Sequence, residues 1–148
     1  MAEGFLKALL RKDEKLSAEF AAFSAGVAAY DGDPASIQAI ETLQTGWGID
    51  ISGHRAACLM ERIIEDSHLV LAMTRSHKNH ILSLFPGARQ KVYTLKEYSY
   101  NLKPDPAYEP YDYKMDVTDP FGMPSNVYNQ CASEIKEAVD RLFEKIRQ

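Results

Sequence analysis

Apolar positions that recur every three or four residues predict a helix at the start of the chain, over residues 1–16. Residues 19–24 are short, apolar and aromatic, which predicts a strand that ends at Ser24-Ala25-Gly26, where glycine permits a sharp exit. The apolar stripe of the predicted first helix consists of Phe5, Leu6, Leu9, Leu10 and Leu16.

A second helix is predicted to begin at Asp33-Pro34, with Asp33 as the N-cap and Pro34 at the first helical position. A glycine at position 46 or 48 is expected to end it. Its buried face is predicted to consist of Ile37, Ile40 and Leu43. A further helix is predicted over residues 56–65.

The near-continuous apolar run at residues 68–73 is typical of a parallel strand covered on both faces. Residues 76–84 are predicted to be helical, residues 91–95 to form a strand and residues 125–147 to form a long amphipathic helix. This alternation predicts one α/β domain over residues 1–148, a three-layer sandwich with a small parallel sheet. The inward side chains of the last helix are predicted to be Val127, Ile135, Val139, Leu142, Phe143 and Ile146.

A long insert at residues 101–124 does not fit a compact connection, because it contains five prolines together with Tyr108, Tyr111 and Tyr113. Loops of this length are usually functional lids or disordered segments. We expect part of this insert to form a lid. The alternative is that the insert is an extended loop on the surface.

The end of this insert carries the most suggestive chemistry of the chain. Pro120 fixes its own backbone and biases Asp119 away from helix, and Gly122 allows a tight turn. A carboxylate held on a turn beside the ring of Phe121 suggests a proton donor. Asp116 is the nearest rival for this role, and a turn carboxylate without any function is the alternative for Asp119.

Composition narrows the class of protein. The net charge of −4 argues against a nucleic-acid partner, and no apolar run approaches the length of a membrane span. Two cysteines far apart, Cys58 and Cys131, give no disulfide framework and fit a reducing cytoplasm; both are expected to be structural. The histidines form no zinc spacing with them, so we expect no metal and no cofactor; the pair His77 and His80 is expected on the surface.

Several stretches occur in the order and spacing of one known family: residues 1–5 (MAEGF), 24–26 (SAG), 71–74 (LAMT), 119–122 (DPFG) and 127–128 (VY). Together they resemble the low-molecular-weight protein-tyrosine-phosphatase family over nearly the whole chain. Residues 92–98 (VYTLKEY) look most like its bacterial members, including the branch that dephosphorylates phosphoarginine.

The resemblance implies a role for particular residues. It implies that Asp119 is the general acid, that Phe121 flanks the substrate, and that His54 and Ser24 support the phosphate loop. For His54 a surface loop histidine without function remains an equal alternative. The implied partners are phosphorylated proteins, and the resemblance leaves phosphotyrosine and phosphoarginine open.

One departure from the family stands out. The family's first, central strand leads into a phosphate loop of the form C-x5-R-S/T-P ahead of the M-A-E-G helix. This chain begins at that methionine, and neither Cys58 nor Cys131 is followed by arginine at the sixth position. We therefore expect the strand, the nucleophilic cysteine and the phosphate-binding arginine to be absent and the chain to be inactive.

Loss of a central strand removes about 1.5–3 kcal/mol for each buried apolar residue, which approaches the whole stability of a typical domain. Three arrangements would restore the lost stability. The native product could start upstream of Met1, the exposed sheet edges could allow strand exchange or a homodimer, or another chain could supply the strand. Two functions remain as alternatives. One is a non-catalytic protein-binding module (a pseudophosphatase); the other is an arsenate reductase, which would need companion cysteines near Cys58.

Overall fold

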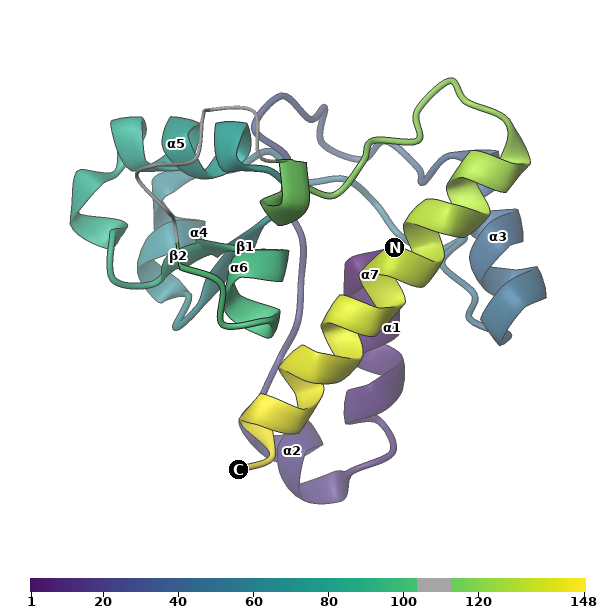
Figure 1. The fold of residues 1–148 in the computed structure, drawn as a ribbon, viewed down its shortest axis with the longest axis horizontal. Helices are drawn as coiled ribbons and strands as arrows, with labels where there is room; N and C mark the ends of the chain where they lie inside the picture. The colour runs from purple at the N-terminus through teal and green to yellow at the C-terminus, as the bar shows by residue number, and fades with distance from the viewer. Residues whose placement is uncertain (104–112) are drawn as a thin grey trace. The chain divides into compact units, whose positions relative to one another are not determined.

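The computed structural model describes residues 1–103 and 113–148, and its contacts divide the chain into two units (Figure 1). The first unit consists of Met1–Cys58 and Asp119–Gln148, and the second consists of Leu59–Thr118. The predicted lid falls partly on residues 104–112, which lie outside the described residues. Within the described residues, no helix combines the length and the apolar character that a bilayer crossing requires.

The first unit is built around the long C-terminal helix α7 (Ser125–Ile146), which packs against α1 (Ala2–Leu10) and α3 (Ile37–Trp47). Figure 1 shows α7 in yellow running beside α1 in purple. The prediction of an amphipathic last helix is confirmed, although Val127 and Ile146 at its two ends are only half-buried. The buried face of α7 consists of Tyr128, Cys131, Ala132, Ile135, Ala138, Val139, Leu142 and Phe143.

The single helix predicted over residues 1–16 is wrong, because the chain breaks into α1 and a short helix α2 (Glu14–Glu19). The Asp13 side chain accepts a hydrogen bond from the Leu16 backbone N–H at 3.1 Å and thereby caps α2. An N-capping aspartate takes an extended backbone conformation, so the first helix has to end before it. The break still lets Leu10 and Leu16 share one apolar cluster with Phe143.

The strand predicted over residues 19–24 is also wrong. Glu19 belongs to α2, and residues 20–25 form no ladder. Only Gly26 pairs, through a single parallel bridge to Cys58 in which its N–H donates to the Ala57 carbonyl at 2.9 Å. An apolar, aromatic segment is therefore extended here without the repeated hydrogen bonds that define a strand.

Helix α3 begins later than the predicted start at Asp33-Pro34, because Ser36 is the N-cap and its Oγ accepts from the Ala39 N–H at 3.3 Å. The later start changes the face that each residue occupies. Leu43 is fully buried as predicted, whereas Ile37 is 70% exposed, which contradicts its predicted inward position. Gly48 ends the helix with φ 66°, the left-handed conformation that glycine adopts without cost.

The second unit contains a small parallel sheet, as predicted. Strands β1 (Val70–Ala72) and β2 (Val92–Thr94) pair in parallel and are connected by α5 (Arg75–Leu84) and the 3-10 turn η1 (Pro86–Ala88). Helix α4 (Glu61–Asp66) precedes β1 and begins later than the predicted residue 56, and the 3-10 turn η2 (Tyr113–Met115) lies within the insert at residues 101–124. The core of this unit consists of Ile64, Ala72, Ile81, Ala88 and Val92.

A short helix that the sequence prediction missed, α6 (Leu95–Ser99), follows β2 directly. Thr94 and Glu97 form a capping box, in which Thr94 Oγ1 accepts from the Glu97 N–H at 3.1 Å and Glu97 Oε2 accepts from the Thr94 N–H at 3.0 Å. Glu97 also forms an ion pair with Lys78 of α5 at 2.7 Å. The T-x-x-E spacing is the sequence signal for this helix start.

Gly4 lies where α1 approaches its neighbours most closely. A Cβ atom at Gly4 would lie 2.8 Å from Cγ2 of Ile51 and 3.3 Å from Cδ2 of Leu43. The Ile51 methyl is on a β-branched carbon with little rotational freedom, so relief requires the backbone to move.

We therefore expect Gly4→Ala to lower the free energy of unfolding by about 1 kcal/mol, because an overpacking cost of about 1–3 kcal/mol exceeds the gain in helix propensity. Urea unfolding measures the change. Gly46→Ala in α3 is the matched control, since a Cβ there meets nothing within 4 Å, and it should stabilise the protein. Equal effects of the two substitutions would contradict the close approach at Gly4.

Ser99 generates a second prediction, because its Oγ is buried and has no hydrogen-bond partner within the described part of the chain. A buried hydroxyl without a partner costs about 1–3 kcal/mol. Ser99→Ala should leave the stability unchanged or raise it by about 1 kcal/mol in urea unfolding. Thr94→Val is the control, because it keeps the shape but removes a partnered hydroxyl, and it should destabilise the same unit.

Candidate functional site

Three side chains of the first unit converge on the carboxylate of Glu3, in the first turn of α1. Ser24 Oγ donates to Glu3 Oε2 at 2.5 Å, and His54 Nδ1 lies 3.6 Å from the same oxygen. Lys7, one helical turn further along α1, donates to Glu3 Oε1. The structure therefore brings together two predicted supporting residues, Ser24 and His54, through a third residue that the prediction did not include.

The electrostatics of this cluster favour an ionised Glu3. Burial by itself would raise the pKa of Glu3, but hydrogen bonds from Lys7 and Ser24 and the nearby charges of Lys7 and His54 together lower it below its ordinary value. The Glu3 side chain is only 14% exposed, compared with 45% for Lys7 and 30% for His54. A carboxylate with these partners fixes the orientation of both the serine and the histidine.

The sequence carried one local signal for this cluster. Glu3 and Lys7 stand four residues apart on a helix, which is the spacing of a surface ion pair. Nothing in the spacing of Ser24 or His54 indicated that they would meet the same carboxylate, because these contacts span 21 residues or more.

The second element of the candidate site is the turn that holds Asp119. Asp119 Oδ1 accepts a hydrogen bond from the Phe121 backbone N–H at 3.0 Å. The Met123 N–H donates to the Pro120 carbonyl at 2.9 Å, and Gly122 has φ 74° at the third position of this turn. A positive φ at that position is the requirement of a type II turn, so glycine is favoured there.

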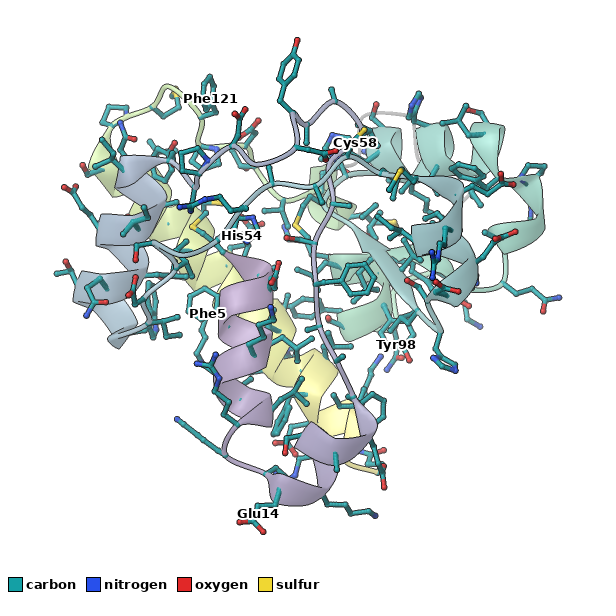
Figure 2. The ribbon with its side chains drawn as sticks, turned by 180° about the vertical axis from the view of Figure 1, so that it is seen from behind. Phe5, Glu14, His54, Cys58, Tyr98 and Phe121 are labelled. Carbon is teal, nitrogen blue, oxygen red and sulfur yellow. The ribbon has the colours of Figure 1, made fainter. Side chains whose placement is uncertain are left out.

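Asp119 and Phe121 both point to the surface of the molecule. Phe121 is 80% exposed, among the most exposed large apolar side chains in the described residues, and Asp119 is exposed as well. Figure 2 shows Phe121 on the loop that precedes α7 and His54 beside the first turn of α1. Nothing in the geometry tests the roles of Asp119, Phe121, His54 and Ser24 in catalysis, which remain predictions.

The rival carboxylate, Asp116, lies in the second unit and already has partners. Its Oδ1 accepts from the Arg75 backbone N–H at 2.7 Å and lies 3.4 Å from Arg75 Nε. Arg75 is the first residue of α5, so Asp116 places a negative charge at the positive end of that helix. Asp116 therefore has a structural task that Asp119 does not share.

The two cysteines lie in different surroundings. Cys131 is 3% exposed on the inner face of α7, which agrees with its predicted role as a small core residue. Cys58 is half-buried, and its backbone N–H donates to Asp31 Oδ1 at 2.6 Å. In the described ranges, no group of three or more His, Cys, Asp and Glu side chains could hold a metal ion, and His77 and His80 are exposed as predicted.

Comparison with known proteins identifies the class. The model of the low molecular weight phosphotyrosine protein phosphatase family matches residues 1–148. The chain therefore belongs to this family, and the family predicted from the sequence motifs is confirmed. The family is one of phosphatases, hydrolases of phosphoric monoesters in proteins.

Two similar proteins are named as protein-arginine-phosphatases. The one from Geobacillus stearothermophilus is 36% identical over 124 residues, which cover 84% of this chain and 75% of the relative. The one from Bacillus subtilis is 34% identical over 148 residues, which cover 99% and 87% respectively.

Solved structures show the same α/β fold. The low molecular weight protein tyrosine phosphatase from T. tengcongensis is 41% identical, with a TM-score of 0.80 over 97% of this chain and 88% of that one. The YwlE arginine phosphatase from Geobacillus stearothermophilus is 32% identical, with a TM-score of 0.78 over 99% and 82%. The similarity thus extends to members named for phosphotyrosine and for phosphoarginine.

The lowered pKa of Glu3 predicts how its contribution to stability depends on pH. A carboxyl group whose pKa is lower in the folded state stabilises the fold above its ordinary pKa of about 4.5 and loses this contribution as the pH falls through the folded value. Wild-type protein should therefore be more stable than Glu3→Gln at neutral pH, and the difference should disappear in acid.

Urea unfolding at a series of pH values from neutral to below about 4.5 measures this difference. Glu41→Gln, at an exposed position on α3, is the matched control and should give a small difference that does not change with pH. A Glu3→Gln effect that persists unchanged into acid would mean that the charge of Glu3 contributes nothing.

Proposed function

We propose that this chain is a protein phosphatase domain for phosphotyrosine or phosphoarginine, in which Asp119 is the general acid. The observation that carries the proposal is the turn at residues 119–123, where one oxygen of an exposed carboxylate is held by the Phe121 N–H. Among the described residues, the structure gives the other oxygen, Oδ2, no hydrogen bond, so it is open to a proton and a substrate.

The chemistry of phosphate removal needs such a group. When a phosphoryl group leaves a tyrosine oxygen or an arginine nitrogen, the departing atom gains negative charge, and a proton delivered to it lowers the barrier. The conjugate base can then activate the water that completes hydrolysis. In this proposal the exposed ring of Phe121, one residue beyond the proline, packs against the substrate side chain.

The Glu3 cluster supports the proposal as the second part of the site. In the family, a histidine in the position of His54 supports the phosphate loop by hydrogen bonding. We propose that Glu3 fixes the orientation of His54 and Ser24 for this task, because a carboxylate that contacts His54 Nδ1 leaves Nε2 to point elsewhere.

The chain alone supplies no nucleophile of the family's kind, because its sequence contains no C-x5-R motif. A phosphate loop places backbone N–H groups, a thiolate and an arginine around one phosphate, and each makes a separate contribution to catalysis. We therefore propose that these residues, in the cytoplasm of a cell, act only together with such a loop and do not hydrolyse substrate alone.

A non-catalytic binding protein is the second candidate, and turnover by a chimera that carries the C-x5-R motif would count against it. An arsenate reductase is less favoured, because its redox chemistry needs cysteines at short spacing and the only other cysteine, Cys131, is buried in α7.

The test has two arms. The chain as it stands should not hydrolyse para-nitrophenyl phosphate, a phosphotyrosine peptide or a phosphoarginine peptide. Hydrolysis that survives replacement of both Cys58 and Cys131 but is abolished by Asp119→Asn would reveal a nucleophile of another kind and overturn this expectation.

In the second arm, a strand with a C-x5-R-S/T-P loop is placed ahead of Met1. This chimera should hydrolyse one or both peptides, and Asp119→Asn should lower its kcat by about 10²–10⁴-fold. Asp33→Asn, at another exposed loop aspartate of the first unit, is the matched control and should leave kcat unchanged. A chimera that binds phosphopeptides without any turnover would favour the binding protein.

A further inference from the structure

The connection that leads from the second unit to Asp119 is anchored by a cluster of contacts around Asp116. Besides the two contacts of its carboxylate with Arg75, the Asp116 backbone carbonyl accepts from Lys96 Nζ at 2.8 Å. The next residue, Val117, is 5% exposed, and its N–H donates to the Met73 carbonyl at 2.8 Å. We call Asp116, Arg75 and Lys96 the Asp116 latch.

The latch ties together parts of the unit that are far apart in the sequence. Met73 and Arg75 stand at the end of β1 and the start of α5, and Lys96 lies on α6. The Arg75 and Asp116 side chains are only 26% and 19% exposed, so this charged contact is partly shielded from solvent. A hydrogen bond to a charged group contributes more than one between neutral groups.

The distance along the chain from the latch to the candidate acid is short. Only Thr118 separates the anchored Val117 from Asp119, and two Cα–Cα steps span at most about 7 Å. The hydrogen bonds of the turn join residues within 119–123 and fix the shape of the turn. They do not fix the conformation of Thr118, through which the chain reaches the turn.

We propose that Asp116 is a positioning residue for Asp119: through the latch, it holds the chain segment that delivers the general acid. This inference rests on the proposed function of Asp119. Asp116 does not touch substrate; by holding residues 116 and 117 it leaves only a short stretch of chain ahead of the turn that carries Asp119. A catalytic group that is misplaced by about 1 Å can lose about 10²-fold in rate, so such a restriction has a functional consequence.

The test measures order along the segment in the full chain and needs no hydrolysis. In Asp116→Ala, backbone amide relaxation at Thr118, Phe121 and Gly122 should show order parameters that fall from about 0.85 to below about 0.6. The amides of Val92–Thr94 in β2 should keep their wild-type values. Asp116→Asn should rescue much of the order, because its side-chain oxygen still accepts from the Arg75 N–H and only the charge is lost.

Asp66→Ala is the matched control, since Asp66 is a 69%-exposed carboxylate of the same unit that pairs with Arg62 across one helical turn. It should leave all order parameters unchanged. Unchanged values at Thr118 and Gly122 in Asp116→Ala, or an equal fall in β2, would overturn the inference, because Asp116 would then serve only α5 or the unit as a whole. If Asp116→Ala is too unstable to study, Asp116→Asn alone decides, with an intermediate fall expected at the same amides and no fall overturning the inference.

This result and the proposed function can fail separately. Loss of order in Asp116→Ala together with an unaffected kcat in Asp119→Asn of the phosphate-loop chimera would retain the latch and reject Asp119 as the acid. A large kcat effect of Asp119→Asn without any change of order in Asp116→Ala would retain the acid and reject the latch.

Discussion

The packing of α1 and α3 against α7 is the interaction on which the first unit and its candidate site depend. Ala132 and Ala138 of α7 are fully buried, and such small side chains allow neighbouring helices to approach closely. Phe5 of α1 is also fully buried, and its ring meets Trp47 edge-on at a centroid distance of 5.1 Å. The functional candidates then follow from the helix ends: Glu3 is in the first turn of α1, His54 follows α3 and Asp119 precedes α7.

The sequence predicted those parts of the fold whose signals are local and repeated. Helix α7 was predicted nearly to its ends, because a long amphipathic period outweighs any single residue. The two strands β1 and β2 were predicted from apolar runs bounded by polar residues. The alternation of predicted strands and helices supplied the fold class, and the motifs supplied the family.

The errors arose where a single capping residue decided the outcome. Asp13 divides the predicted first helix and Ser36 shifts the start of α3, and both do so by accepting one backbone N–H three residues later. Several residues near each start could have served as the cap, and the sequence does not rank them. The strand predicted at residues 19–24 failed for a different reason, because a strand needs a partner and the pattern of one segment says nothing about its neighbours.

The candidate site shows the same division between local and distant information. The roles of Asp119, Phe121, His54 and Ser24 were predicted from the resemblance to a family, whereas the contacts of Glu3 with Ser24 and His54 came only from the structure. The Asp116 contacts likewise connect residues 41 and 20 positions apart, and no spacing rule covers such distances. Motifs identify which residues matter in a family, but contacts identify what holds them.

Asp116 and Asp119 are identical side chains three residues apart, and their surroundings give them different capabilities. Asp116 is partly buried, accepts from Arg75 through its carboxylate and from Lys96 through its carbonyl, and stabilises a helix start. These contacts give the Asp116 carboxylate a structural task. Asp119 has one backbone N–H on one oxygen and solvent around it, beside an exposed ring. In the proposed function the two carboxylates therefore have separate tasks: Asp116 anchors the chain, and Asp119, which keeps one oxygen open, transfers the proton.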